Sequence, residues 1–379
     1  MTHPSQSRRI ESLITQDHQL RLSIGTTELP APKADEIIVR VEAAPINPSD
    51  LALLLGPADL STARAAGTAK DPVVSIDIPK DKIKTIQGRI GKPMSVGIEG
   101  AGIVVSAGSS DLAQSLIGQT VSMAAGNMLT EYRCVKAATV IPMGDKIMPK
   151  QVGSCFVNPM TALSIVEAVR RDGANSFVHT AAASNLGQML NRVCLDDDVD
   201  IVNIVRSPEQ EKLLRDIGAK YIVNSASDSF EAELTAAIKE TGAYIAFDAT
   251  GGGALVNTIL TCMERAASAG KPYDRYGSNT LKKINIYGRL DNSSIVLKPN
   301  FGFTFSINGW LLMPFLQTVD PKRIHELRQR IIAEIKTTFA SHYSAEISMQ
   351  DALTVEALTK FGKIKTGQKA LINPHKVSA

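Results

Sequence analysis

A short turn of small residues stands between a predicted strand and a predicted helix, where backbone groups can approach a phosphate. It reads Ala182-Ala-Ser-Asn-Leu-Gly187 and occupies the place of the pattern GxGxxG, of which only the third glycine is kept. Small residues let backbone N–H groups reach a pyrophosphate, and the N-terminus of the helix adds partial positive charge. One glycine is a weak signal by itself, but the strand–turn–helix position and the second strand–helix unit strengthen it. We predict a dinucleotide site with contacts from Ala182, Ser184, Asn185, Leu186 and Gly187; the alternative is an ordinary turn in an α/β domain that binds another ligand.

The end of the second predicted strand indicates which dinucleotide would bind. An NAD site usually places Asp or Glu there, roughly 20 residues after the turn, to bind the ribose hydroxyls. This chain has Val205-Arg206-Ser207 at that point. A guanidinium and a hydroxyl bind a 2′-phosphate, and no acid repels it, so Arg206 and Ser207 favour NADPH over NADH. The alternative is a solvated arginine that simply follows a strand.

The elements that would hold these residues alternate between strands and helices from about residue 155 onward. Strands alternating with helices of 10–15 residues indicate a parallel sheet, and right-handed crossovers make it doubly wound. Ligands of such sheets bind at the carboxyl ends of the strands. The predicted strands are 176–180, 199–205, 221–223, 244–247, 284–288 and 301–305, and the predicted helices are 161–169, 186–193, 208–217, 229–240 and 321–339.

The first 150 residues predict a different kind of domain. Short β-branched segments at 36–42, 102–106 and 120–123 are separated by glycines and prolines, which is typical of a compact, mostly β domain. Residues 56–94 lack strong periodicity and predict a loop-rich excursion. A closing strand at 366–372 is expected to return to this first domain.

Composition excludes several classes of partner. The 379 residues carry a net charge of +3, with 21% charged and 44% hydrophobic residues, so neither nucleic acid nor an anionic membrane is predicted. The polar N-terminus lacks the apolar core of a signal peptide, and we expect a cytoplasmic protein without a membrane span. The four cysteines lie far apart and predict reduced thiols rather than a disulfide scaffold or a zinc lobe.

Several segments form an ordered set over most of the chain, namely 35–50 (DEIIVRVEAAPINPSD), 97–104 (GIEGAGIV), 158–162 (NPMTA), the turn at Ala182, 213–219 (LLRDIGA) and 366–369 (TGQK). In this set the chain resembles the medium-chain dehydrogenase/reductase superfamily, and within it the zinc-free quinone oxidoreductase-like branch. The resemblance implies a Rossmann domain inserted in a mostly β GroES-like catalytic domain, with a small-molecule acceptor in the cleft between the domains. The expected ranges are 1–153 and 311–379 for the catalytic domain and 154–310 for the Rossmann domain. A homodimer is the family expectation.

The positions that match the metal ligands of the zinc-dependent members carry the wrong side chains for zinc. They are Asn47, Ile98 and Val157, whereas zinc needs thiolate, imidazole or carboxylate donors. We therefore predict no metal. Without a Lewis acid, the reaction left is hydride delivery from NADPH to an acceptor that is already conjugated, such as a quinone.

The resemblance also implies roles for individual residues. Asn47 would donate a hydrogen bond to the acceptor carbonyl, Ser49 would be a relay hydroxyl, and Thr161 would contact the nicotinamide. The alternatives are that Asn47 only holds the turn before Pro48 and that Ser49 caps a helix beginning near Asp50. No tyrosine occurs in 51–56, where related reductases commonly carry one, so a tyrosine proton donor is not expected there. Further cofactor contacts are expected from Asn224, Ala249, Thr250, Gly251, Gly288, Arg289, Leu290 and Lys369; a loop or solvated charge is the alternative for each.

Two other functions remain open at this point. A 2-enoyl thioester reductase is the first, because the segment Asn47-Pro-Ser-Asp50 also suggests it. The second is a non-catalytic protein that binds NADPH, which would not oxidise the cofactor with any quinone or enone.

Overall fold

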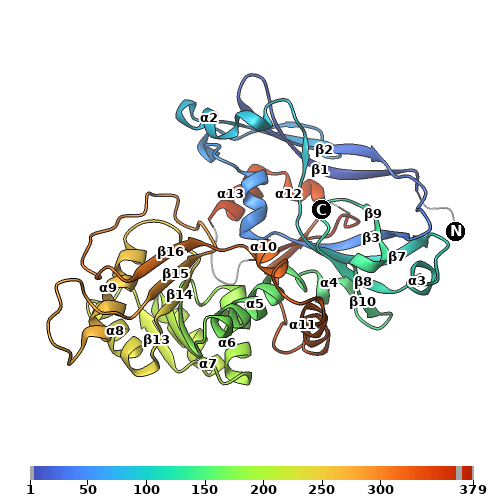
Figure 1. Cartoon of the computed structure of the whole chain (residues 1–379). Coiled ribbons are helices and arrows are strands. Elements are labelled where there is room, and N and C mark those ends of the chain that lie inside the picture. Colours follow the sequence, from blue (N-terminus) through green and yellow to red (C-terminus); the bar gives the residue numbers. More distant parts are fainter. Residues whose placement is uncertain (1–3, 364–368, 378–379) are drawn as a thin grey trace. The chain divides into compact units, whose positions relative to one another are not determined.

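The computed structural model describes residues 4–363 and 369–377, and the chain divides into two compact units (Figure 1). Unit 1 comprises Met1–Val157 and Ile335–Ala379, and unit 2 comprises Asn158–Glu334. One unit is thus inserted into the other, as the resemblance implied. The second boundary differs from the expected residue 311.

The later boundary has a local cause. Helix α11 (Pro321–Ala333) is held to unit 2 by ion pairs from Arg323 to Glu167 at 2.5 Å and from Arg330 to Asp197 at 2.7 Å. The short helix α10 (Leu312–Leu316) precedes it. Charged side chains on the surface of α11 make these contacts. A hydrophobic pattern in the sequence therefore does not predict to which unit the helix belongs.

Unit 2 contains the predicted doubly wound sheet. Its six strands are all parallel and lie in the order β13-β12-β11-β14-β15-β16, with helices on both sides (Figure 1). In chain order this is 3-2-1-4-5-6, so the strand order reverses between β11 and β14, where such folds bind dinucleotides. The strands are β11 (Ser176–His179), β12 (Asp200–Val205), β13 (Tyr221–Asn224), β14 (Ile245–Asp248), β15 (Lys282–Ile286) and β16 (Phe305–Gly309). The helices between them are α5 (Val157–Arg171), α6 (Asn185–Asp196), α7 (Pro208–Ile217), α8 (Phe230–Thr241) and α9 (Leu255–Ser268).

Unit 1 is mostly β, as predicted, and holds two sheets around one core. The first has the order β4-β5-β2-β1-β6, and the second has β10-β8-β7-β3-β18-β17 with β9 also paired to β3. Its longer strands are β1 (Gln6–Ile14), β2 (Gln19–Glu28), β3 (Glu36–Pro45), β5 (Pro72–Asp77), β7 (Gly100–Ala107) and β9 (Tyr132–Lys136). The shorter elements are α1 (Leu51–Leu54), β4 (Arg64–Gly67), α2 (Ile83–Ile86), β6 (Met94–Ser95), α3 (Asp111–Ser115), β8 (Thr120–Met123), β10 (Ile141–Gly144) and α4 (Pro149–Val152).

The returning segment completes the second sheet. Strand β18 (Ala370–Ile372) pairs antiparallel with β3 and parallel with β17 (Ala345–Ile347), and the helices α12 (Met349–Ala352) and α13 (Val355–Gly362) lie between these two strands in the chain. The predicted closing strand therefore returns to unit 1. Its residues 366–368 lie outside the described residues.

Three sequence predictions are corrected. The stretch 56–94 is not only a loop-rich excursion, because β4, β5 and β6 in it join the first sheet. The last strand of unit 2 begins at Phe305 rather than at 301, since Phe301 packs into the core and Gly302 adopts a φ of +68°. The long helix ends at Ala333 instead of 339.

One described stretch, Pro149–Arg171, has the length and hydropathy of a membrane span, but 72% of its most apolar window is buried in the folded chain. Burial is what the core helix of a folded domain shows, and α5 fits that description. All four cysteines are free, as predicted; Cys155, Cys194 and Cys262 are buried, and Cys134 is half-buried.

Candidate functional site

The turn 182–187, where the sequence predicts a pyrophosphate site, connects β11 closely to α6. Ser184 is the N-cap of α6, and its Oγ accepts a hydrogen bond from the backbone N–H of Gly187 at 3.1 Å. A Cβ on Gly187 would lie 2.1 Å from the carbonyl oxygen of Ala182, so only glycine allows this close approach of helix and strand. Ala182 is fully buried, whereas Ser184, Asn185 and Leu186 are half-buried. The turn is therefore partly accessible at the N-terminus of a 12-residue helix.

Arg206 and Ser207, the residues predicted to bind a 2′-phosphate, follow β12 as expected. Their hydrogen bonds within the protein differ. Arg206 is exposed, and its backbone N–H donates to Oε1 of Gln210 at 3.0 Å. Ser207 is the N-cap of α7, and its Oγ accepts from the backbone N–H of Gln210 at 3.4 Å. The hydroxyl of Ser207 thus already caps α7. The guanidinium of Arg206 is therefore the stronger candidate to bind a phosphate.

The loop after β14 is built around the buried carboxylate of Asp248, whose side-chain role the sequence does not predict. Asp248 is fully buried, and its Oδ1 accepts from Oγ1 of Thr180 at 2.7 Å and from the N–H and Oγ1 of Thr250 at 3.0 and 2.6 Å. Its Oδ2 accepts from the N–H of Gly251 at 2.9 Å. Thr180 Oγ1 also accepts from the N–H of Ala249 at 2.8 Å. Asp248 therefore joins the nucleotide turn to the neighbouring loop.

These bonds reduce the number of backbone groups of Ala249, Thr250 and Gly251 that are available to bind a cofactor. The N–H groups of all three are already hydrogen-bonded, and the carbonyl oxygens of Ala249 and Thr250 accept from the N–H groups of Leu290 and Asp291. Most of the backbone groups with which these three residues could contact a cofactor are therefore already hydrogen-bonded. Their visible role is to hold two loops together.

Of the remaining residues predicted to contact the cofactor in unit 2, Gly288, Arg289 and Leu290 lie on the loop after β15, whereas Asn224 and Thr161 lie on other elements. A Cβ on Gly288 would lie 2.5 Å from the carbonyl oxygen of Ala249, which explains the glycine. Arg289 and Leu290 are exposed beside it. Asn224 ends β13, but its Nδ2 donates to Oε1 of Glu211 at 2.7 Å and its Oδ1 accepts from Ala226 N–H. Thr161 lies in α5 and is 7% exposed.

A buried imidazole and a tyrosine also meet at the carboxyl ends of these strands. Nε2 of His179 and the hydroxyl of Tyr287 lie 2.8 Å apart, and the rings are stacked with centroids 5.9 Å apart. Burial lowers the pKa of His179 to about 4, so the imidazole is neutral near pH 7. Neither residue was predicted, because nothing in the local pattern distinguishes them from core residues.

In unit 1, the Glu99 carboxylate holds Asn47. Glu99 is fully buried, its Oε1 accepts from Nδ2 of Asn47 at 3.0 Å, and its Oε2 accepts from the backbone N–H groups of Phe156 at 3.1 Å and Val157 at 2.7 Å. Val157 begins α5, so the carboxylate also lies at the positive end of a helix. The acid was visible in the segment 97–104 as an ionisable residue among glycines and aliphatic residues.

Asp50 is a second buried acid beside Asn47. Its Oδ2 accepts from the backbone N–H of Asn47 at 2.8 Å, within the 3₁₀ turn Pro48–Asp50. Burial raises the pKa of Asp50 to about 7, the charge of Glu99 adds to this, and the Asn47 N–H and Lys369 oppose it. Ser49 is exposed in the same turn and is not its cap, because Asn47 holds that position.

The returning segment adds a lysine and a tyrosine. Nζ of Lys369 donates to Oγ of Ser154 at 2.7 Å, and the hydroxyl of Tyr343 donates to the same oxygen at 2.9 Å. Burial lowers the pKa of Lys369, against the charges of Glu99 and Asp50, and raises that of Tyr343. We call Asn47, Asp50, Glu99, Ser154, Tyr343 and Lys369 the unit 1 polar cluster. The contact of Lys369 with a pyrophosphate stays a prediction.

The unit 1 polar cluster does not resemble a metal site. In residues 4–363 and 369–377, no group of three or more His, Cys, Asp or Glu side chains is arranged to hold a metal ion. Of the matching positions, Asn47 and Val157 bind Glu99 instead, and Ile98 is aliphatic. Zinc independence stays a prediction that rests on these side chains.

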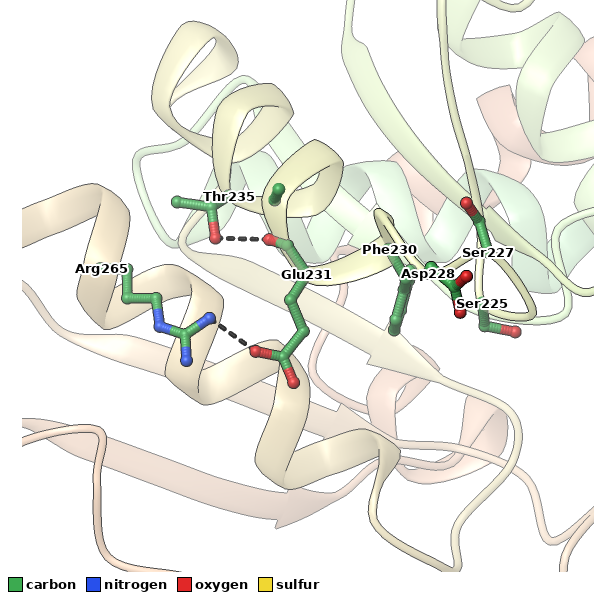
Figure 2. A pocket seen from close by; sticks show the side chains of 8 residues that line it. Ser225, Ser227, Asp228, Phe230, Glu231, Thr235 and Arg265 are labelled. Carbon is green, nitrogen blue, oxygen red and sulfur yellow. Dashed lines mark hydrogen bonds and ion pairs between the residues drawn. The ribbon is translucent and has the colours of Figure 1, made fainter.

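A surface cavity of about 620 Å³ lies elsewhere in unit 2, where α8 begins beside α9 (Figure 2). Glu231 spans it, with an ion pair to Arg265 at 2.6 Å and a backbone oxygen that accepts from Oγ1 of Thr235 at 2.7 Å. Phe230 and Ser225 line it as well (Figure 2). Arg265 and Glu231 pair with each other in this cavity, and none of the predicted cofactor residues lines it.

Comparisons with known proteins agree with this architecture. No family model matches the chain. A Mesorhizobium loti protein that carries the name NADPH:quinone reductase is 25% identical, with a TM-score of 0.71 over 99% of this chain and 100% of that one. Mouse prostaglandin reductase-3 is 27% identical over 160 residues, which are 42% of each chain. Mouse mitochondrial enoyl-[acyl-carrier-protein] reductase is 26% identical over 228 residues, which are 58% of this chain and 54% of the relative. The chain thus matches about half the length of these curated relatives.

The fold and the site together define a two-unit α/β protein with a dinucleotide-type turn at the switch point of an inserted sheet. This is the fold of the medium-chain dehydrogenases/reductases, and structures of the quinone reductase type are among its neighbours, as the resemblance predicted.

Proposed function

We propose that this chain is an NADPH-dependent oxidoreductase that reduces a quinone or a similar conjugated carbonyl. The observation that carries the proposal is the turn at 182–187, where a Cβ on Gly187 would collide with Ala182 and the half-buried Ser184–Leu186 segment opens the helix N-terminus to a ligand. These features fit a pyrophosphate. The NADPH in the name of the Mesorhizobium loti protein supports the same cofactor.

The nicotinamide would supply the hydride, and the residues of this chain would bind, orient and protonate. In unit 2, the N-terminus of α6 receives the pyrophosphate and Arg206 receives the 2′-phosphate. Asp248 and Thr180 keep the adjoining loops in place, at 2.7 Å from each other. A neutral His179 beside Tyr287 adds no charge there.

In unit 1, the polar cluster would stabilise the negative charge that grows on the acceptor oxygen. Asn47 has an amide N–H for this purpose, and Lys369 supplies positive charge from the returning segment. Asp50, Tyr343 and Ser154 are the nearby groups that carry protons. Because Asn47, Ile98 and Val157 offer no thiolate, imidazole or carboxylate, we propose a reaction that needs no metal.

A 2-enoyl thioester reductase is the second candidate. The match to mitochondrial enoyl-[acyl-carrier-protein] reductase over 58% of this chain favours it. The two reactions share hydride transfer to a conjugated system and differ in whether carbon or oxygen is protonated afterwards. The polar cluster supports both.

An acceptor screen that follows NADPH absorbance tests the proposal. Quinones, enones and a crotonyl thioester would be compared at equal concentration, with NADH in parallel. We expect turnover with a quinone that exceeds turnover with the thioester. Tight binding of NADPH with no oxidation by any of these acceptors would contradict the proposal and leave a non-catalytic binding protein.

A further inference from the structure

One buried carboxylate joins the three segments that carry the positions matching zinc ligands. Glu99 follows Ile98 in the chain, and it binds the Asn47 side chain with one oxygen and the Val157 N–H with the other. The distances are 3.0 and 2.7 Å, and Phe156 N–H adds a third bond at 3.1 Å. These segments are therefore cross-linked by a protein side chain.

The environment of this carboxylate indicates that its bonds are strong. Glu99 has no solvent exposure, so its charge must be compensated by the protein. Two backbone N–H groups at the start of the 15-residue helix α5 and the positive charge of Lys369 provide that compensation. Hydrogen bonds to a charged acceptor are stronger than neutral ones, which makes the geometry around Glu99 rigid.

The bond to Glu99 decides which end of the Asn47 amide faces the carboxylate. A carboxylate only accepts, so Nδ2 of Asn47 must point toward it and Oδ1 must point away. Nδ2 carries two hydrogens, and one remains after the bond to Glu99 is made. Oδ1 is buried and accepts no hydrogen bond from the described residues. A reversed amide would place two acceptors against each other.

We propose that Glu99 is the positioning residue of this site: it sets the orientation of the Asn47 amide so that the remaining N–H is held for the acceptor oxygen. The proposal deepens the proposed function and, for its catalytic consequence, rests on it. Glu99 acts through Asn47 and through the start of α5, without contact to the acceptor.

The first experiment reads the amide directly in the full-length protein. Asn47→Ala identifies the side-chain amide signal of Asn47 in a ¹H–¹⁵N NMR spectrum by its disappearance. We expect Glu99→Gln to shift this signal and to speed hydrogen exchange at Phe156 and Val157, whose N–H groups lose their charged acceptor. Glu131→Gln is the matched control, because Glu131 accepts the backbone N–H of Arg8 at 3.1 Å in the same unit. An Asn47 signal that Glu99→Gln leaves unchanged overturns the proposal, whatever the reaction proves to be.

The second experiment tests the catalytic consequence by a double-mutant cycle with NADPH and a quinone. We expect Glu99→Gln to lower kcat by about 10- to 100-fold and to leave the Kd of NADPH within about twofold, because only orientation in unit 1 changes. In the Asn47→Ala background, Glu99→Gln should have little further effect on kcat, since the group it orients is gone. Effects that multiply fully would show that Glu99 acts independently of Asn47 and would overturn the proposal.

Two further outcomes are separated by design. If Glu99→Gln does not fold, Glu99→Asp is measured in the same way; it keeps the charge but is too short to reach both partners. If none of the tested acceptors supports oxidation of NADPH by the wild-type protein, the proposed function fails. The NMR experiment still decides whether Glu99 orients Asn47.

Discussion

The hydroxyl of Thr180 donates to the buried carboxylate of Asp248 at 2.7 Å, and this bond joins the strand before the nucleotide turn to the loop of the next strand. Thr180 directly follows β11 and Asp248 ends β14, and the order of the sheet reverses between these two strands. The shape of the predicted cofactor site thus depends on a contact between residues 68 positions apart in the chain.

Asp248→Asn tests this relationship. Asparagine has one acceptor oxygen where aspartate has two, so the variant loses an acceptor for the N–H groups and hydroxyls that donate to Asp248. We therefore expect the free energy of unfolding to fall by about 1–3 kcal/mol and NADPH to bind more weakly. Chemical denaturation and a fluorescence titration measure the two effects. Asp216→Asn, which removes an exposed ion pair to Lys212, is the control and should change stability by less than about 1 kcal/mol. Equal effects of both variants would show that the buried network is unimportant.

Arg206→Ala tests the choice of cofactor. Loss of a charge-assisted contact to the 2′-phosphate should raise the Kd of NADPH by about 10- to 100-fold and leave that of NADH nearly unchanged. The control is Lys220→Ala, an exposed cation just before β13 and therefore at the opposite, amino end of the strands. If both cofactors weaken equally, Arg206 does not recognise the phosphate.

Metal analysis tests zinc independence. Because Asn47, Ile98 and Val157 offer no thiolate, imidazole or carboxylate, we expect no stoichiometric zinc after gentle purification. Turnover should also be unchanged after treatment with a chelator. One tightly bound zinc per chain would contradict the prediction.

Asp50 predicts a dependence of stability on pH. Its pKa is raised from 3.8 to about 7 in the folded protein, mainly by burial, so the folded state holds a proton that the unfolded state has lost. The stability contributed by Asp50 is therefore fully present below about pH 4 and is lost as the pH rises to 7. Asp50→Asn mimics the neutral acid, and its advantage over the wild type should grow from less than about 1 kcal/mol at pH 4 to roughly 4 kcal/mol above pH 7. Unfolding curves between these pH values measure it, and a difference that is the same at every pH would contradict it.

An exposed sheet edge predicts self-association. Strand β16 ends the sheet of unit 2, and large apolar side chains beside it are exposed, with Leu311 at 66% and Met313 at 59%. Such an edge pairs readily with a second copy, so we expect a homodimer by light scattering. The double variant Leu311→Lys/Met313→Lys should be monomeric with unchanged melting, whereas Leu112→Lys in α3 of unit 1 should remain dimeric. A monomeric wild-type protein would rule out this interface.

The alternation of strands and helices, the short turn at Ala182 and the residues after β12 were predictable from the sequence, because each follows from local periodicity or spacing. Glu99, Asp50 and Asp248 were not, because what distinguishes them is burial and a partner far away in the chain: Glu99 meets Asn47 across 52 positions and Val157 across 58. The same holds for Tyr343 and Ser154, which are 189 positions apart. The sequence by itself determined the class of fold and the place of the nucleotide turn, since local chemistry specifies both. Only the tertiary structure decided which polar groups are already hydrogen-bonded and which are left to bind a ligand, because burial and distant partners decide this: the buried Glu99 carboxylate is paired, whereas the buried Oδ1 of Asn47 has no partner in the described part of the chain.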